Sequence, residues 1–305
     1  MKKIALIAGA ILVATTCWAH LPEGLLRAAV QFPAGNEPII DSNLADWDVV
    51  TDAYLITHED LTETVTGLGT ERDAADLALR GFVGWSPNTN KVYIMEDRYD
   101  DAVWVGDHTW DNVDGRGSGC SGNARDFLEI QIDGDHSGGQ FNSWKDDNLT
   151  QEEKDILHGQ QAQGYGLRPN GRYAWHKTYE HALPPFGDAA FTCTNGPGEP
   201  GNFYAEYMYT PWNDLRWTDV PNSVQHILTE GEIMGFNFTV LDSDTGGGYD
   251  GYWTLSGDTN SCHHADFLSD FLLTPIDPDI DWSSQNRGTA VEDNTWGQIK
   301  ATFAE

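Results

Sequence analysis

Short segments in which apolar and polar residues alternate recur along the chain, and clusters of Gly, Asn, Asp and Pro separate them. This period-two pattern is typical of β-strands that cover a core on one side. In one segment, Leu128, Ile130 and Ile132 share one face of the strand, whereas Glu129 and Gln131 share the other. The sequence therefore predicts an all-β fold, an antiparallel, jelly-roll-like β-sandwich. The clearest strand segments are residues 53–57, 77–85, 91–96, 127–133, 203–209, 233–241, 251–255 and 267–274.

Signals for helices are few. Thr150 and Glu153 form a capping-box pattern, which predicts a short helix that ends near His158. Pro211 predicts one helical turn over residues 211–215. Because no long amphipathic helices alternate with the strands, a doubly wound α/β fold is not expected.

The segment 134–202 is long, polar and rich in Gly and Pro, so we expect a loop-rich insertion between core strands. No break in composition marks a second domain, and residues 20–305 are expected to form one sandwich domain. In the tail, residues 277–305, the apolar residues Ile299, Ala301 and Phe303 alternate with polar ones and predict an edge strand.

The first residues have the pattern of an export signal. Lys2 and Lys3 precede an apolar run over residues 4–13, and small residues follow up to Ala19, after which we expect cleavage. The run is shorter than the roughly 20 apolar residues that cross a bilayer. Residues 1–19 therefore predict a periplasmic, extracellular or cell-surface protein. A lipoprotein acylated at Cys17 is an alternative interpretation.

The chain is strongly acidic, with 48 Asp and Glu against 17 Lys and Arg and a formal net charge of -31. Such a charge repels a phosphate backbone, which argues against a nucleic-acid partner. The 12 Trp, 11 Tyr and 12 Phe residues supply enough apolar surface to offset the entropy of ordering. We therefore expect a folded, acidic protein.

Three cysteines remain after the expected cleavage, namely Cys120, Cys193 and Cys262. Export favours a disulfide between two of them, but spacing leaves all three pairings open. The absence of a CxxC pair argues against attached c-type haem and thioredoxin-like chemistry.

Six motifs follow one another along the chain: residues 41–47, residues 91–94 leading to Asp100 and Asp101, and residues 126–130, 205–215, 235–244 and 251–255. Together they resemble the ordered landmarks of the family 9 carbohydrate-binding-module-like sandwich, over about residues 38–275. The resemblance implies a β-sandwich, calcium held in loops and, in sugar-binding members, aromatic residues that grip a terminal sugar unit. The same sandwich is similar to haem-binding subunits of exported molybdenum dehydrogenases, so the fold alone does not set the function.

Two glycine-rich loops with alternate aspartates each follow a predicted strand. The first holds Asp133 and Asp135, and the second holds Asp242 and Asp244, with Asp250 as a further ligand. Such loops can direct several carboxylate oxygens at one Ca²⁺ ion, which takes six to eight oxygen ligands. The alternative is that Asp and Gly simply form the turns of hairpins. The sequence thus predicts calcium as a cofactor, bound by these aspartates.

Four tryptophans fall in polar loop sequence and are candidates for carbohydrate binding, because the C–H face of a sugar ring packs on an indole ring. They are Trp104, Trp110, Trp144 and Trp175. Trp47, Trp85 and Trp212 lie in or beside strand motifs, and we expect them in the core.

Histidines suggest a competing metal chemistry. His263 and His264 are adjacent, so they share a metal only if the backbone turns there. His20 would become the N-terminal residue after cleavage and could chelate copper. For haem b, Met95 with either His176 or Lys177 could supply the axial ligands, but Met95 also fits an ordinary strand residue.

These patterns favour an exported, calcium-stabilised β-sandwich that binds an oligo- or polysaccharide without transforming it, in polysaccharide recognition or catabolism. No GxSxG or HExxH motif is present, and a carboxylate pair for glycoside hydrolysis cannot be located from spacing. Two alternatives remain, a haem-binding electron-transfer subunit and a structural protein of the cell surface.

Overall fold

The structure is a computed structural model that describes residues 21–67, 73–104, 117–118, 126–168, 171–173, 179–194, 198–245 and 250–286. Several predictions from the sequence concern residues outside these ranges. They are the export signal at 1–19, the tail strand at 299–303, and the residues Trp110, Trp175, Cys120, His20, His176 and Lys177.

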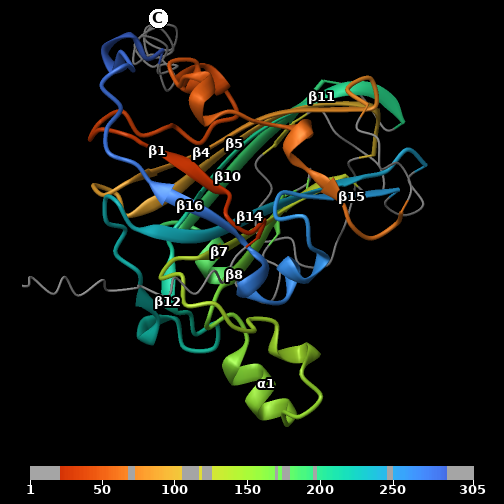
Figure 1. Ribbon diagram of the computed structural model, residues 1–305, viewed down its shortest axis with the longest axis vertical. Helices are drawn as coiled ribbons and strands as arrows, with labels where there is room; N and C mark the ends of the chain where they lie inside the picture. The colour runs from red at the N-terminus through yellow and green to blue at the C-terminus, as the bar shows by residue number, and fades with distance from the viewer. Residues whose placement is uncertain are drawn as a thin grey trace, which may run out of the picture.

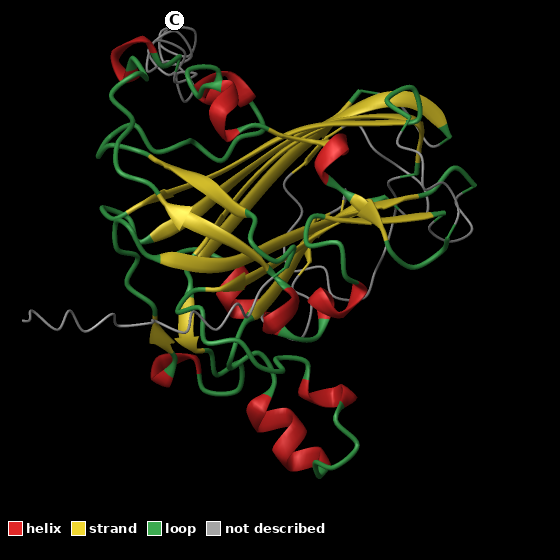
Figure 2. Cartoon of the chain, viewed as in Figure 1, coloured by secondary structure: helices red, strands yellow, loops and turns green. Residues whose placement is uncertain are grey.

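Two layers of β-strands make up the molecule (Figures 1 and 2). The first layer contains β2 (Ile56–Thr57), β4 (Leu77–Ser86), β5 (Lys91–Val103), β6 (Gly117–Ser118), β10 (Gly187–Cys193) and β11 (Glu199–Tyr209). The second layer contains β3 (Thr62–Glu63), β7 (Phe127–Asp133), β8 (Gln163–Arg168), β9 (Gly171–Tyr173), β14 (Ile233–Asp242), β15 (Gly251–Thr254) and β16 (Ser269–Leu273). Most neighbouring strands are antiparallel, so the predicted β-sandwich is confirmed.

Strand β1 (Leu26–Gln31) joins the two layers. Its first residues pair in parallel with β16, from Leu26 opposite Asp270, and its last residues pair in parallel with β4, from Val30 opposite Gly84. The sequence analysis missed this strand, because its apolar and polar residues do not alternate.

The main core fills the space between the layers, because alternate residues of each strand point inward. Leu128, Ile130 and Ile132 are all buried in it, as predicted, and Trp85 is buried there too. Glu129 and Gln131 point the other way but are also buried, because the segment that follows β15 covers them. Asn237 in that covered region donates hydrogen bonds to the side chains of Gln131, Thr239, Thr254 and Ser261.

A second apolar cluster covers the outer face of the first layer, where Phe82 and Met95 meet residues from near both ends of the chain. Trp47, on the short 3-10 helix η1 (Leu44–Trp47), is fully buried in it and stacks on Phe82 at 6.3 Å between ring centroids. Trp47 and Trp212 are therefore core residues, as expected. Met95 is 1% exposed and packs in this cluster, which is the behaviour of an ordinary strand residue.

The predicted helix is present as α1 (Gln151–Leu157), and Thr150 and Glu153 form its capping box. The predicted helical turn at 211–215 is wrong, because β12 (Trp212–Asp214) occupies it and pairs with β13 (Val224–Gln225). Residues 53–57 form a strand only at β2, after a turn of 3-10 helix. The other short 3-10 helices are η2 (Asp52–Tyr54), η3 (His58–Asp60), η4 (Ser143–Lys145), η6 (Tyr179–Ala182), η7 (Val220–Asn222), η8 (Thr259–Cys262), η9 (Ala265–Phe267) and η10 (Trp282–Ser284).

The segment 134–202 carries α1, η4 and η6 with their loops, but it also contributes strands to both layers. β8 pairs with β7 in the second layer, and β10 pairs with β11 in the first. The expectation of an insertion between core strands was therefore incomplete. Within the described residues, no helix has the length and apolar content needed to cross a membrane.

Candidate functional site

Six aspartates from both layers lie together at one end of the sandwich, where strands begin and end. In the first layer the start of β4 lies beside the end of β5, since Leu77 pairs with Asp100. In the second layer the start of β7 lies beside the end of β14, since Phe127 pairs with Leu241. Antiparallel neighbours place the end of one strand beside the start of the next. We call this end of the sandwich the acidic end, and its aspartates are Asp76, Asp100, Asp101, Asp126, Asp242 and Asp244.

The inner group of the acidic end consists of Asp100, Asp126 and Asp242. One carboxylate oxygen from each lies within 4.8 Å of the other two. All three residues are at most 4% exposed, and Oδ2 of Asp100 and Oδ1 of Asp126 and Asp242 have no hydrogen-bond partner among the described residues. Unused, buried carboxylate oxygens that converge on one point are the donor set a hard cation requires.

The protein alone does not compensate this buried charge. Burial, together with the charges of Asp100 and Asp76, raises the pKa of Asp242 to about 8. Burial also holds the pKa of Asp126 well above its usual value, and Asp100 contributes to that shift. Without a cation, these groups are therefore driven to keep their protons.

Arg98 is a buried cation beside the inner group, but its guanidinium already contacts Glu96 and a main-chain carbonyl. Its Nε lies 3.2 Å from Oε1 of Glu96, and its Nη1 donates a hydrogen bond of 3.1 Å to the carbonyl oxygen of Leu241. Four buried carboxylates, those of Glu96 and the inner group, thus face one guanidinium. The residues present fit a divalent cation, and because no His or Cys takes part, they fit Ca²⁺ better than zinc or copper.

The outer group of the acidic end consists of Asp76, Asp101 and Asp244, which are more exposed. Burial raises the pKa of Asp244 to about 6, with further contributions from Asp76 and Asp101. Asp250, predicted as a ligand, instead accepts a hydrogen bond of 3.0 Å from the amide of Asp244 and so shapes the loop. The structure therefore brings Asp242 and Asp244 into carboxylate groups and gives Asp250 a supporting contact.

Trp104, a predicted sugar-binding residue, lies directly at the acidic end. Its amide donates a hydrogen bond to Oδ2 of Asp126, and its indole Nε1 donates one of 2.9 Å to the carbonyl oxygen of Asp244. The ring packs on the backbone of Gly198, where a side chain would clash with it, and it stays partly exposed. Trp104 thus bonds to the inner group through the carboxylate of Asp126 and to the outer group through the main-chain carbonyl of Asp244.

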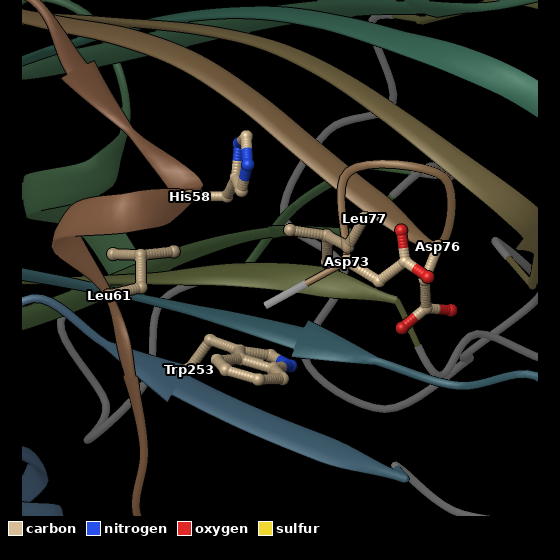
Figure 3. Close-up of a pocket in the computed structure, with 6 residues that line it drawn as sticks. All are labelled: His58, Leu61, Asp73, Asp76, Leu77 and Trp253. Carbon is tan, nitrogen blue, oxygen red and sulfur yellow. The ribbon is translucent and has the colours of Figure 1, made fainter. Parts of the chain in front are cut away.

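A small pocket opens beside the outer group (Figure 3). His58 and Trp253 face it from opposite sides, and Asp73 and Asp76 lie at its rim. Its volume of about 10 Å³ admits roughly one water molecule and is too small for a sugar ring. The pocket can therefore supply a water molecule near Asp76.

The first acidic loop lies elsewhere. Because β7 and β14 are antiparallel, Asp133 pairs with Gly235, at the opposite end of β14 from Asp242. Oδ1 of Asp133 accepts a hydrogen bond from the amide of Ser137 at 3.3 Å, and Oδ2 accepts one from Gly138 at 2.8 Å. Asp135 is exposed and also accepts from Ser137. These aspartates close a turn, and no group of metal-binding side chains forms around them within the described residues.

Trp144, another predicted sugar-binding residue, packs beside α1. Its ring stacks on that of His158 at 4.0 Å between centroids, and its Nε1 donates to Asp155. Figure 1 places α1 well apart from β15 and the acidic end, so Trp104 and Trp144 do not share a site.

The histidines and cysteines of the η8–η9 region do not converge on a metal. His263 contacts Cys262 and Asn142, whereas His264 faces Asp266 at 3.1 Å. Cys262 is a buried, reduced thiol. Of the three pairings that the sequence left open, only Cys120 with Cys193 remains, and it stays a prediction because Cys120 lies outside the described residues.

The candidate ligands at the acidic end that the sequence did not single out are Asp76, Asp100, Asp101 and Asp126. Asp100, Asp101 and Asp126 appear in the sequence motifs, but only as landmarks. A usable local signal exists: Asp100 and Asp101 interrupt the end of a strand, and Asp126 directly precedes one.

No protein-family model matches the chain, and no curated protein matches it. Among solved structures, a family 9 carbohydrate-binding module from Caldicellulosiruptor kristjanssonii in complex with cellotriose is similar, with a TM-score of 0.50 and 12% identity over 83% of this chain and 96% of that chain. A family 9 module from the same organism in complex with glucose gives a TM-score of 0.49 and 12% identity, over 84% and 99% of the two chains. The first of these likenesses establishes the fold, which is the sandwich that the sequence motifs resemble.

Proposed function

We propose that the protein binds an oligo- or polysaccharide without transforming it, through the surface around Trp104, and that Ca²⁺ at the acidic end holds this surface in place. The single observation that carries the proposal is the contact between Trp104 and the two groups of aspartates. A partly exposed indole ring offers an apolar face to the C–H groups of a sugar. The family 9 fold, of which one solved member holds cellotriose, supports the same ligand class.

Calcium in the inner group would act on Trp104 through Asp126, which accepts its amide, and through the loop that begins at Asp242, where the carbonyl oxygen of Asp244 accepts its indole N–H. When the ion is bound, the carboxylates are ionised and fixed, so the amide of Trp104 keeps a charged acceptor in Asp126. When the ion is removed, three close carboxylates repel each other or take up protons. The loop that carries Trp104 then loses its support, and sugar affinity falls.

The export signal expected at residues 1–19 would put this activity outside the cytoplasm, where polysaccharides and millimolar calcium occur together. Calcium sites of extracellular modules work at dissociation constants of roughly 10⁻⁴ to 10⁻³ M. The proposed site therefore needs no unusual affinity. Its role would be in the recognition or catabolism of polysaccharide.

The test is calorimetric titration with soluble cello- and xylo-oligosaccharides, in calcium and again after chelation. We expect saturable binding that chelation weakens, and a loss of about tenfold or more in affinity for Trp104→Ala. Trp217→Ala is the matched control, since Trp217 is also partly buried but bonds to the carbonyl oxygen of Asp155 beside α1. No binding to any sugar, with or without calcium, would overturn the proposal.

A further inference from the structure

An open hollow lies on the outer face of the first layer, away from the acidic end. It has a volume of about 310 Å³ and is lined by residues 42–45 together with Asp48, Asp97 and Tyr204. Tyr204 sits between Phe203 and Ala205, which both face the main core, and Asp97 pairs with Tyr204 across the sheet. Because neighbouring strand residues point to opposite faces, the sheet itself separates this hollow from the inner group of aspartates.

Several polar side chains of the hollow keep hydrogen-bonding capacity, although the hydroxyl of Ser42 bonds to Thr192 and Asp48 and Asp97 form ion pairs with Arg80. Among the described residues, Asn43, Asp48, Asp97 and Tyr204 make no side-chain hydrogen bond. Arg80 is the nearest cation, and its nitrogens lie 3.7 Å from Asp48 and 3.9 Å from Asp97, too far for hydrogen bonds. Its guanidinium rests over the ring of Phe82, at 5.3 Å from the centroid. The hollow thus offers a ligand hydrogen-bond acceptors and donors that make no hydrogen bond within the described residues, and an aromatic ring to pack against.

The wall of the hollow is held rigidly without any ligand. Glu206 accepts hydrogen bonds of 2.8 Å from the indole of Trp47 and the amide of Ser42, and one of 3.1 Å from the amide of Asp41. The hydroxyl of Ser42 also bonds to that of Thr192 at 2.8 Å. Since the wall is fixed in advance, a ligand would lose little affinity to ordering it.

The charges of the hollow select the class of ligand. Two carboxylates against one guanidinium, on a chain of formal net charge -31, disfavour an anion such as a phosphate or a uronate. Two carboxylates beside an arginine also fall short of the six to eight oxygens that calcium takes. A neutral ligand rich in hydroxyl groups matches the set, because its hydroxyls donate to the carboxylates and its C–H face packs on the tyrosine ring.

We propose that this hollow is a second carbohydrate contact, which holds an internal unit of a neutral polysaccharide chain while the acidic end holds another part. The inference rests on the proposed function only in taking the ligand to be carbohydrate. Two contacts joined by one polymer raise the apparent affinity without any new interaction. The hollow is open, as an internal unit of a chain requires.

The test compares two kinds of ligand. Binding to insoluble cellulose and xylan is measured by depletion, and binding to short oligosaccharides by calorimetry. We expect Tyr204→Ala to weaken polysaccharide binding by about tenfold or more and to leave affinity for short oligosaccharides at the acidic end unchanged. Tyr204→Phe keeps the ring and should retain most of the binding. Asp188→Asn is the control. Asp188 in β10 precedes Ala189, which faces the main core, so Asp188 lies on the outer face of the first layer but outside the hollow.

Asp97→Asn serves as a second variant, because it removes one charge from β5 while keeping the size of the side chain, and it should also weaken polysaccharide binding. Thermal melting of each variant establishes that it is folded. If Tyr204→Ala and Asp97→Asn both bind polysaccharide as the unmodified protein does, the second contact is overturned while the proposed function stands. If the unmodified protein binds no carbohydrate at all, both proposals fall.

Discussion

Two loops of this molecule share one sequence pattern and differ in what their aspartates do. After β7, both carboxylate oxygens of Asp133 accept hydrogen bonds from the amides of the same loop. After β14, Oδ1 of Asp242 has no partner among the described residues, and one carboxylate oxygen of Asp242 lies within 4.8 Å of oxygens of Asp100 and Asp126. The first loop satisfies its own aspartate, whereas the second leaves a buried carboxylate oxygen that the described residues do not use.

The difference comes from what the rest of the fold brings to each loop. Beside the first loop lie Pro211 and His226, which approach Gly134 closely, and Asp270, which bonds to His136 at 2.9 Å. Beside the second loop the ends of β4 and β5 arrive from the other layer with further acids. Asp266 and Asp270 also reach the first loop, but they bond to the amide of Gly139 and the ring of His136. Alternate aspartates in a glycine-rich turn are therefore candidates for calcium only where other segments add carboxylates that the protein itself does not use.

The largest expected effect concerns calcium and stability. Adding Ca²⁺ to the chelated protein should raise its melting temperature, by an amount equivalent to about 2.7 kcal/mol when free calcium is about 100 times the dissociation constant. Asp242→Asn should remove this response, and Asp133→Asn, the matched change in the first loop, should keep it. Differential scanning calorimetry measures both. A calcium response that Asp133→Asn abolishes and Asp242→Asn preserves would show that the first loop, and not the second, binds calcium.

The second prediction concerns pH in the absence of metal. Burial raises the pKa of Asp242 to about 8 and that of Asp244 to about 6, above their ordinary value of 3.8. The folded state then holds protons that the unfolded chain has released, so this contribution to stability is present at low pH and is lost as pH rises from about 4 to about 8. Urea unfolding in chelator should show the free energy of unfolding falling over this range.

Calcium competes with these protons, so its addition should flatten that fall. Asp242→Asn, which does not titrate, should flatten it as well in chelator. An equal slope in the unmodified protein and in Asp242→Asn would show that other groups dominate the pH dependence.

The third prediction concerns the first loop. Asp133→Ala removes the acceptors of the amides of Ser137 and Gly138, and leaving the buried amide of Gly138 unsatisfied costs about 1–3 kcal/mol. Chemical denaturation should give the same loss with and without calcium, because the loop works through its own hydrogen bonds. A loss that appears only in calcium would mean that this loop also binds the ion.

The smallest expected effect is at Asp135. Its carboxylate is exposed and accepts one long hydrogen bond of 3.3 Å. Asp135→Asn should change the free energy of unfolding by no more than about 0.5 kcal/mol, in calcium or in chelator. Denaturation curves of the two proteins should overlap, and a clear separation in calcium alone would contradict this reading of the loop.

The strands and the helix were predictable where their signals are local. β7 shows its alternation within seven residues, and α1 shows its capping box within four. β1 was missed because it serves two sheets, and its burial changes partway along its length. A pattern that assumes one buried face does not find such a strand.

The candidate site was only half predictable for a related reason. Asp242 and Asp244 stood out as a loop pattern, but Asp76, Asp100 and Asp126 join them from three other segments. Their convergence depends on which strand edges meet across the two layers, and that information is tertiary. Trp104 stood out in the sequence because polar residues surround it. Nothing local marked Asp97 and Tyr204 as neighbours, because only the pairing of β5 with β11 brings them together.

Strand β1 also fixes the order in which the molecule can be completed. Its first residues take their place only when β16, near the other end of the described chain, is available, although its last residues can pair earlier with β4. Contacts so distant in sequence form slowly, because a long loop must close first. The first strand of the described chain therefore keeps part of one edge unpaired until β16 has been synthesised. We expect truncated chains that stop short of residue 269 to remain open and to associate with one another.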